Sequence, residues 1–188
     1  MELKGERLIP ATIDATWAAL NDPATLKACI AGCESLERVG DDAFVAVVAM
    51  KVGPVSARFK GNLKLTNVDP PKGYTINFDG QGGVAGFGKG SADVALTPSG
   101  EATRLAYDAR ATVGGKMAQI GSRLIDATAG KITEDFFAAF EAQLEAKAAP
   151  EVVAARAAAA ARVRQPAGAL GWILIALVAA AILYLLLR

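Results

Sequence analysis

The chain has 188 residues and a mass of 19.3 kDa, which is room for one ordinary domain and a tail. Apolar residues make up 53% and charged residues 21%, which excludes a disordered protein, and a net charge of +1 gives no basic domain for nucleic acid. Histidine is absent, which excludes Ser-His-Asp and Cys-His catalysis and histidine metal sites, and the two cysteines are too few for a disulfide scaffold.

The first thirty residues predict a strand followed by two short helices. Residues 1–9 alternate weakly and end at a proline, as a strand does. Thr12 is placed to cap a helix that carries Ile13, Trp17 and Leu20. Asp22 and Pro23 then supply an N-cap and a first helical position for a second helix that reaches residue 30.

Six strand-like runs follow the two helices. The run from 55 to 65 alternates apolar and polar residues without a break, which is typical of an antiparallel strand with one solvated face. The six predicted strands are residues 34–39, 43–52, 55–65, 74–78, 91–96 and 104–113.

After Gly114 and Gly115 the apolar period becomes helical for about 30 residues, with Gly130 expected to weaken or bend the helix. The predicted inner stripe is Met117, Ile120, Leu124, Thr128, Ile132, Phe136, Phe140 and Leu144. This order predicts an α+β helix-grip fold, in which a curved antiparallel sheet of about seven strands surrounds a long helix. A cavity is expected between them, where small residues leave room: Gly61, Ala109, Ala111, Gly121 and Thr128.

The C-terminal segment predicts a membrane anchor. Residues 168–187 contain no charge, and twenty helical residues span about 30 Å, the thickness of a bilayer core. Arginines precede the segment at 156, 162 and 164, and one follows at 188, so the positive-inside rule keeps the N-terminal domain in the cytoplasm. We therefore expect a single-pass C-terminal transmembrane helix in the cytoplasmic membrane.

An alanine-rich linker at residues 147–167 separates this helix from the domain at residues 1–146. The linker is interpreted either as a semi-rigid spacer or as a continuation of the preceding helix.

The order of elements resembles the START/Bet v 1-like (SRPBCC) superfamily of helix-grip proteins. Several short motifs in residues 1–146 resemble the CoxG family, the G subunits of carbon monoxide dehydrogenase. They are LNDP at 20–23, CIAGCE at 29–34, KVGP at 51–54, FKG at 59–61, DPP at 69–71, GFGKGSA at 86–92, VGGK at 113–116 and GSRLI at 121–125. One departure is Ala31, where the family often has proline.

The resemblance implies a non-catalytic accessory protein. Members of the family are associated with molybdenum CO dehydrogenase, help to place it at the cytoplasmic membrane, and are thought to bind a quinone-like lipid in the cavity. The resemblance therefore implies a molybdenum hydroxylase and membrane lipid as partners. It implies no covalent cofactor, and a bound quinone that is menaquinone or ubiquinone. Some relatives accompany other molybdenum hydroxylases.

Apolar side chains on the predicted inner faces form the candidate ligand-binding wall. The predicted wall consists of Phe59, Leu63, Phe78, Phe87, Tyr107, Met117, Ile120, Leu124 and Phe136. Each of them, taken singly, fits an ordinary core better than a ligand contact, whereas the set on facing surfaces, with small residues between, favours a lipophilic cavity. The Tyr107 hydroxyl fits either a ligand carbonyl or a backbone partner. No catalytic residue and no metal ligand is predicted.

Residues 80–90 are rich in glycine and nearly match a phosphate-binding loop. Gly90 stands where that motif needs serine or threonine, and strands are predicted on both sides, so nucleotide binding is not expected. The run predicts a mobile hairpin loop with Val84 and Phe87 at its tip. Such a loop would gate the cavity, touch a membrane or partner, or be a plain hairpin.

Two other functions remain open at the level of sequence. One is a lipid carrier or assembly factor. The other is a cyclase, dehydratase or hydrolase acting on a hydrophobic substrate, which would need inward acid or base groups, and only Tyr107 and Arg123 are candidates. Cys29 and Cys33 are expected to be packed free thiols.

Overall fold

The computed structural model describes residues 1–163, and side chains through residue 147. The N-terminal half consists of β1 (Glu2–Ile9), α1 (Ile13–Leu20), α2 (Pro23–Cys29), β2 (Cys33–Arg38), β3 (Ala43–Val52), β4 (Val55–Asp69) and β5 (Gly73–Gln81). A 3-10 turn, η1 (Gly83–Ala85), leads to β6 (Phe87–Ser99) and β7 (Ala102–Gly114). Two helices follow, α3 (Lys116–Gln119) and α4 (Ser122–Val163).

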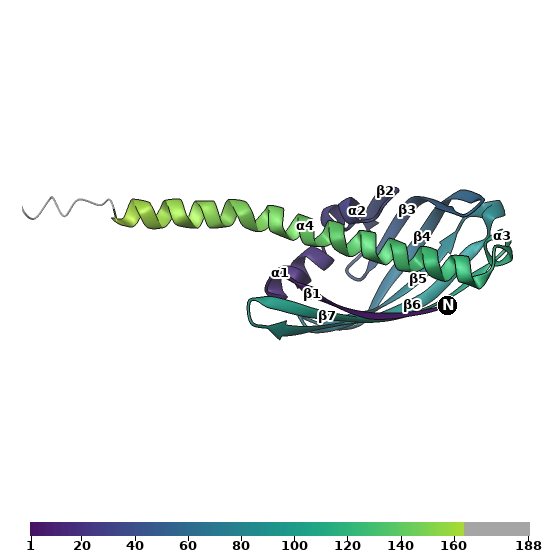
Figure 1. Ribbon diagram of the computed structural model, residues 1–188, viewed down its shortest axis with the longest axis horizontal. Coiled ribbons are helices and arrows are strands. Elements are labelled where there is room, and N and C mark those ends of the chain that lie inside the picture. The colour runs from purple at the N-terminus through teal and green to yellow at the C-terminus, as the bar shows by residue number, and fades with distance from the viewer. Residues whose placement is uncertain (164–188) are drawn as a thin grey trace, which may run out of the picture. The chain divides into compact units, whose positions relative to one another are not determined.

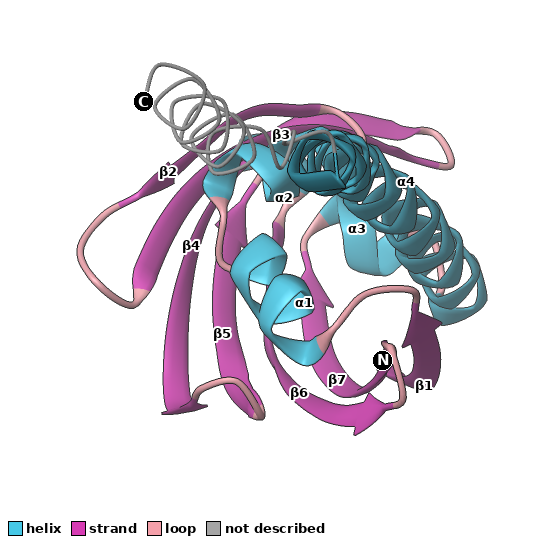
Figure 2. Cartoon of the chain, turned by 90° about the vertical axis from the view of Figure 1, so that its left-hand side faces the viewer, coloured by secondary structure: helices cyan, strands magenta, loops and turns pink. Residues whose placement is uncertain are grey.

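The seven strands form one antiparallel sheet in the order β1-β7-β6-β5-β4-β3-β2. Figure 1 shows α4 lying along the sheet, and Figure 2 shows the sheet curving around the helices. Helix α4 contacts the sheet at an edge strand and at a turn. Arg7 of β1 forms an ion pair with Glu134 of α4, and Leu124 of α4 lies against Gly53 in the β3–β4 turn. The predicted α+β sheet of seven strands, wrapped on a C-terminal helix, is therefore confirmed.

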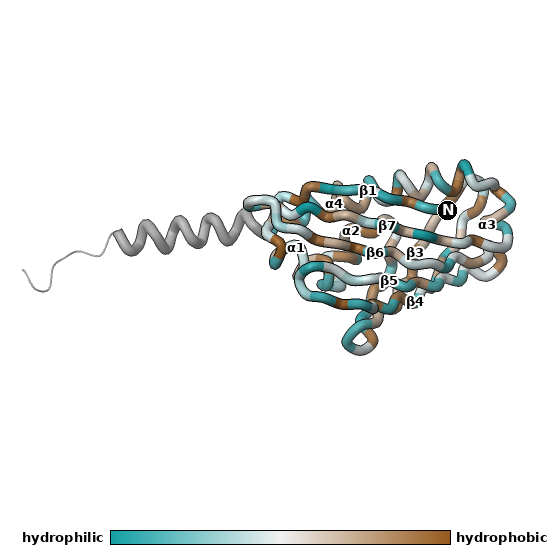
Figure 3. The backbone as a smooth tube through the Cα atoms, turned by 90° about the horizontal axis from the view of Figure 1, so that it is seen from below, coloured by the Kyte–Doolittle hydropathy of each residue, from teal (hydrophilic) through white to brown (hydrophobic). Residues whose placement is uncertain are grey.

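Side-chain alternation gives the sheet a polar, solvent-exposed outer face and an apolar inner face. On β4 the outward residues include Arg58, Lys60 and Lys64, whereas Leu65 on the inner face is buried. The alternation is visible as changing colours along the strands in Figure 3. Ion pairs such as Lys4 to Asp108, at 2.8 Å, link neighbouring strands across the outer face.

The two short helices begin at the predicted caps. The Thr12 side chain accepts a hydrogen bond from the Ala15 amide, and the Asp22 carboxylate accepts bonds from the amides of Ala24 and Thr25. Pro23 occupies the first helical position of α2, where its missing N–H costs nothing.

Two buried clusters hold the fold together. The first joins α1, α2 and α4 to β1, β6 and β7, and consists of Ile9, Ala19, Leu20, Cys29, Leu96, Leu105, Phe137, Phe140 and Leu144. The second lies between the short helices and β2–β5, and consists of Leu36, Phe44, Ala46, Leu65 and Tyr74. Trp17 contacts both clusters and meets the Tyr74 ring edge-on, with centroids 5.4 Å apart.

The predicted helical stripe is partly wrong. The helix breaks at Ile120 and Gly121, where Gly121 has a φ of +90°, and this break separates α3 from α4. In α4 the buried positions are Ile125, Phe137, Phe140 and Leu144, whereas Leu124 is 41% exposed and Ile132 is 37% exposed. The break resets the helical phase, so that the inner face starts from Ile125 and not from Leu124. Helix α4 passes through Gly130 without interruption.

The chain divides into two units, Met1–Lys147 and Ala148–Arg188. Helix α4 runs to Val163, so the residues from 147 to 163 continue the preceding helix, which was one of the two interpretations of the linker. The predicted transmembrane helix at 168–187 lies outside the described residues. Within residues 1–163, no helix is both long and apolar enough to cross a membrane.

The Asp22 cap ties α2 to the end of the domain. The Lys147 ammonium lies 3.2 Å from the Asp22 carboxylate and 2.6 Å from the Thr25 hydroxyl. The hydrogen bond from the Thr25 hydroxyl, assisted by Lys147 and two backbone amides, lowers the pKa of Asp22 to about 2. A carboxyl group with a lowered pKa stabilises the fold above its unfolded pKa and loses this contribution as pH falls through the folded pKa.

We therefore expect Asp22→Ala to lower the free energy of unfolding by about 1 kcal/mol, the usual cost of losing an N-cap. Asp22→Asn keeps a capping side chain without the charge. It should retain most of the stability at pH 7 and lose the pH dependence that Asp22 contributes between about pH 4 and pH 2. Urea unfolding of residues 1–147 at pH 7 and pH 3 measures both effects. Equal stability of Asp22→Ala and the unsubstituted domain would contradict this account.

Candidate functional site

An apolar pocket of about 360 Å³ lies on the inner face of the sheet. Its floor comes from β3, β4, β5 and β6, and its ends are covered by Ile30 after α2 and by Met117 of α3. The remaining apolar side chains around it are Leu36, Ala46, Val48, Met50, Phe59, Leu63, Phe78, Phe87 and Val113. Asn62 and Asp79 also border the pocket, but both are exposed and occupy outward positions in their strands. The pocket is thus lined by apolar side chains from several different elements.

A row of small residues creates this space. In the strand register Ala46 of β3 faces Gly61 of β4, Gly61 faces Gly80 of β5, and Gly80 faces Gly88 of β6. Four adjacent strands therefore present almost no side chain at the same level of the sheet. We call Ala46, Gly61, Gly80 and Gly88 the glycine row. A Cβ atom at Gly61 would meet its nearest neighbour, the Asp79 carbonyl oxygen, at an ordinary 3.6 Å, so glycine is not required there by the backbone.

Five of the nine predicted wall residues border the pocket: Phe59, Leu63, Phe78, Phe87 and Met117. Of the small residues expected to leave room, Gly61 lies at the pocket. Contact of these side chains with a ligand stays a prediction.

The other four predicted wall residues lie elsewhere. The Tyr107 ring stacks on Phe137 at 5.6 Å and lies over Gly5, so it belongs to the core near β1. Phe136 packs against the Phe137 and Phe140 rings. Leu124 is exposed beside Gly53, and Ile120 lies at the helix break. The helix break after α3 explains why Ile120 and Leu124 lie away from the pocket, because the predicted stripe assumed one uninterrupted helix.

The glycine-rich loop is tightly packed at its base. Its Gly82 amide donates to the Gly86 carbonyl oxygen at 2.8 Å. Gly86 has a φ of +113°, and a Cβ atom there would overlap the Gly114 carbonyl oxygen. The Phe59 ring lies under Gly82 of the loop, whereas the Phe87 ring lies over Gly114 at the end of β7. Val84 projects at the tip and is 85% exposed, and Phe87, the other predicted tip residue, begins β6 and is 36% exposed.

An open groove of about 540 Å³ adjoins the pocket. It runs between α4 and the inner end of β3, and shares Ile30, Val48 and Met50 with the pocket wall. Helix α4 contributes polar side chains here, namely Thr128, Lys131 and Asp135. The apolar pocket therefore has a partly polar groove as its neighbour.

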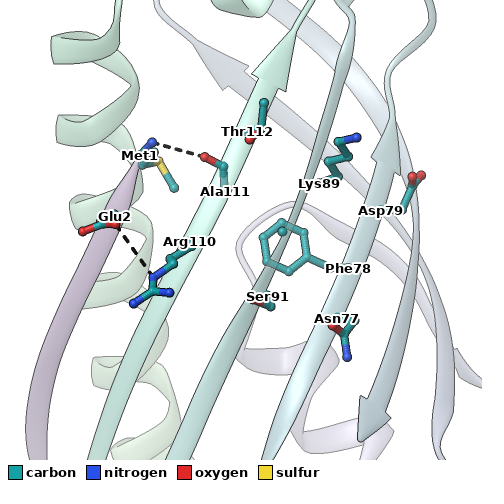
Figure 4. Close-up of a pocket in the computed structure, with 11 residues that line it drawn as sticks. Met1, Glu2, Asn77, Phe78, Asp79, Lys89, Ser91, Arg110, Ala111 and Thr112 are labelled. Carbon is teal, nitrogen blue, oxygen red and sulfur yellow. Dashed lines mark hydrogen bonds and ion pairs between the residues drawn. The ribbon is translucent and has the colours of Figure 1, made fainter.

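A larger hollow of about 640 Å³ lies on the outer face of the sheet (Figure 4). Its charged groups are of both signs and pair with one another. Arg110 lies 3.8 Å from Glu2, the Met1 amino group donates to the Ala111 carbonyl oxygen at 3.2 Å, and Lys89 faces Asp79 in the strand register. Its apolar lining is limited to Met1, Phe78 and Ala111, and it has no dominant charge with which to select a ligand.

Both cysteines are free thiols, and Cys29 is buried. Burial raises the pKa of each thiol, which keeps both of them protonated and unreactive at neutral pH. Both are therefore packed free thiols, as the sequence predicted: Cys29 of α2 belongs to the first cluster, and Cys33 of β2 packs against the second.

Comparison with known proteins identifies the family. The family model for CoxG, the G subunit of carbon monoxide dehydrogenase, matches residues 5–145, three quarters of the chain. The chain belongs to the CoxG family. No protein with a curated function matches this CoxG protein in sequence.

Solved structures support the same fold. A conserved protein from Geobacillus kaustophilus is 32% identical, with a TM-score of 0.73, over 77% of this chain and 95% of its own. Its whole chain therefore corresponds to little more than the Met1–Lys147 unit, which indicates that this unit folds by itself. A START superfamily protein from Mycobacterium smegmatis is 14% identical, with a TM-score of 0.60, over 77% of this chain and 97% of its own. The ZhuI aromatase/cyclase from Streptomyces is 13% identical, with a TM-score of 0.56, over 77% of this chain and 93% of its own, and shows the fold alone.

The packed loop base gives a direct test in this CoxG protein. Gly86→Ala should lower the free energy of unfolding by about 1–3 kcal/mol, because a side chain at this φ is strained and overlaps the Gly114 backbone. Gly80→Ala is the matched control, since its Cβ atom would meet the Gly88 oxygen at 3.7 Å and cost little. Thermal and urea unfolding of residues 1–147 compare the two. A Gly86→Ala variant as stable as Gly80→Ala would show that the loop base is not packed as described.

Proposed function

We propose that this CoxG protein is a non-catalytic accessory protein of a molybdenum CO dehydrogenase-type hydroxylase. Its domain binds a lipophilic ligand, a quinone of the menaquinone or ubiquinone type, and its C-terminal tail anchors the assembly in the cytoplasmic membrane. The observation that carries the binding role is the apolar pocket at the glycine row. The family match supports the association with a CO dehydrogenase system.

The pocket suits an isoprenoid or alkyl chain. The side chains that face into it are hydrocarbon, aromatic or thioether. Transfer of an apolar chain from water into such surroundings is favourable by about 25 cal/mol for each Å² of apolar surface buried. Its volume falls within the usual range for small-molecule sites, which starts near about 300 Å³. The residues of the pocket therefore fit the apolar part of a quinone.

The same lining argues against catalysis. An enzyme acting on a hydrophobic substrate would need an acid or base within hydrogen-bond reach of that substrate. Tyr107, which the sequence offered as a candidate catalytic residue, packs in the core against Phe137. Arg123 lies on the exposed surface at the start of α4. Among the described residues, the side chains that face into the pocket offer no group that titrates near neutral pH.

The membrane role rests on the sequence of residues 168–187 and on the arginines before it. An anchor of this length would keep the domain within a short distance of the bilayer, and a tether of this kind raises the effective concentration of enzyme and quinone for each other. The lipid carrier or assembly factor is the alternative, and it differs in requiring no stable complex with the hydroxylase.

Filling the glycine row tests the binding role. Gly61→Val places a β-branched side chain at the pocket, and its Cβ atom meets the backbone at an ordinary 3.6 Å. Stability should therefore stay equal or rise by up to about 1 kcal/mol. Affinity for decylubiquinone should fall about tenfold or more, because the ligand and the valine compete for one volume. Quenching of Trp17, the single tryptophan of residues 1–147, measures binding.

Ala95→Val, on the outer face of β6, is the control and should bind as the unsubstituted domain does. Unchanged affinity in a folded Gly61→Val domain would contradict the assignment of the pocket as the ligand site.

Deletion of residues 168–188 tests recruitment. The shortened protein should remain folded, and the molybdenum hydroxylase of the same cell should move from the membrane fraction to the soluble fraction. Replacing the segment with an unrelated transmembrane helix of equal length should restore membrane association. A hydroxylase that stays with the membrane after the deletion would overturn the recruitment role.

A further inference from the structure

We propose that the groove beside α4 is the site for the polar ring of the ligand, and that Lys131 is its hydrogen-bond donor. In this arrangement the apolar chain fills the pocket and the ring lies at the surface between α4 and β3. The proposal rests on the proposed function, since it assigns an orientation to the same ligand.

The pocket itself cannot satisfy a carbonyl-bearing ring. Its inward side chains contain no N–H or O–H donor, because the polar neighbours Asn62 and Asp79 face outward. Moving a polar group from water into such a site without a hydrogen bond is unfavourable in free energy. A ligand with a polar ring and an apolar chain therefore gains most when the ring stays outside the pocket.

The groove borders the pocket, because Ile30, Val48 and Met50 line both. In the proposed arrangement, the bound chain passes from the pocket to the groove beside these three side chains. The groove has about 540 Å³, and its far wall is formed by α4. It is thus a polar surface next to the pocket, where the other end of a bound chain can lie.

The polar groups of the groove favour a neutral acceptor over an anion. The Lys131 ammonium lies 2.8 and 2.9 Å from the two oxygens of Asp135. An ammonium has three N–H donors, and these two contacts use at most two of them, which leaves one for a carbonyl oxygen. The paired carboxylate would repel a phosphate or a fatty acid at the same place. A quinone or another ketone-bearing ring fits this pair better than a charged headgroup does.

Thr128 completes the wall one turn away. Its hydroxyl donates to the Leu124 carbonyl oxygen at 2.8 Å, so it offers no further donor. Lys51 also borders the groove, but it is exposed and occupies an outward position on β3, in alternation with Val48 and Met50. Lys131 is therefore the side chain of α4 that can donate to the ligand.

The test compares two ligands that share a ten-carbon chain. Decylubiquinone carries ring carbonyls, and decylbenzene carries an aromatic ring without them. Calorimetry with residues 1–147 should show that Lys131→Met weakens decylubiquinone binding about tenfold, the equivalent of one hydrogen bond to a charged donor, and leaves decylbenzene binding within about twofold. Lys64→Met, on the outer face of β4, should change neither.

Equal decylubiquinone affinity in Lys131→Met and the unsubstituted domain would overturn the ring site. A parallel loss of both ligands in Lys131→Met would also overturn it, since the effect would then not depend on the carbonyls. The Gly61→Val variant separates the two proposals. If Gly61→Val abolishes binding and Lys131→Met does not, the pocket stands and the ring orientation fails. If Gly61→Val has no effect, the proposed function itself fails.

Discussion

The absence of side chains at one level of a curved sheet is the constraint on which this molecule depends. Gly61, Gly80 and Gly88 meet across three adjacent strands, with Ala46 beside them. Protein interiors are packed as densely as organic crystals, and an apolar row of ordinary side chains here would fill the space. Larger side chains next to the glycine row, such as Phe59 and Phe78, then line the sides of the pocket.

The rest of the architecture keeps this space from collapsing. The two buried clusters fix α1, α2 and the later part of α4 on the sheet. The second cluster adjoins the pocket, since Leu36 and Ala46 belong to both. Met117 of α3 and Ile30 after α2 border the pocket, and the Phe59 ring packs under Gly82 of the glycine-rich loop. The first cluster shares no residue with the pocket lining, which explains why a binding function can coexist with a well-packed domain.

Much of the fold could be predicted from sequence because its signals are local. Period-two alternation predicted β4, and the caps Thr12 and Asp22 predicted the starts of both short helices. The site was predicted less completely because it depends on register. Gly61, Gly80 and Gly88 are far apart in sequence, and only the pairing of β4, β5 and β6 aligns them. The break at Gly121 likewise moved Leu124 to the surface, and no local pattern shows how a short helix will be offset from the long one.

The central claim is that a quinone occupies the pocket of the native protein. Mass spectrometry of an organic-solvent extract, taken from the full chain purified under native conditions, tests it directly, with Gly61→Val purified in parallel. The account predicts a quinone in near-stoichiometric amount in the unsubstituted protein and its loss in Gly61→Val. An extract without quinone, or with the same bulk phospholipid in both samples, would contradict it and leave a tether that works through protein contacts alone.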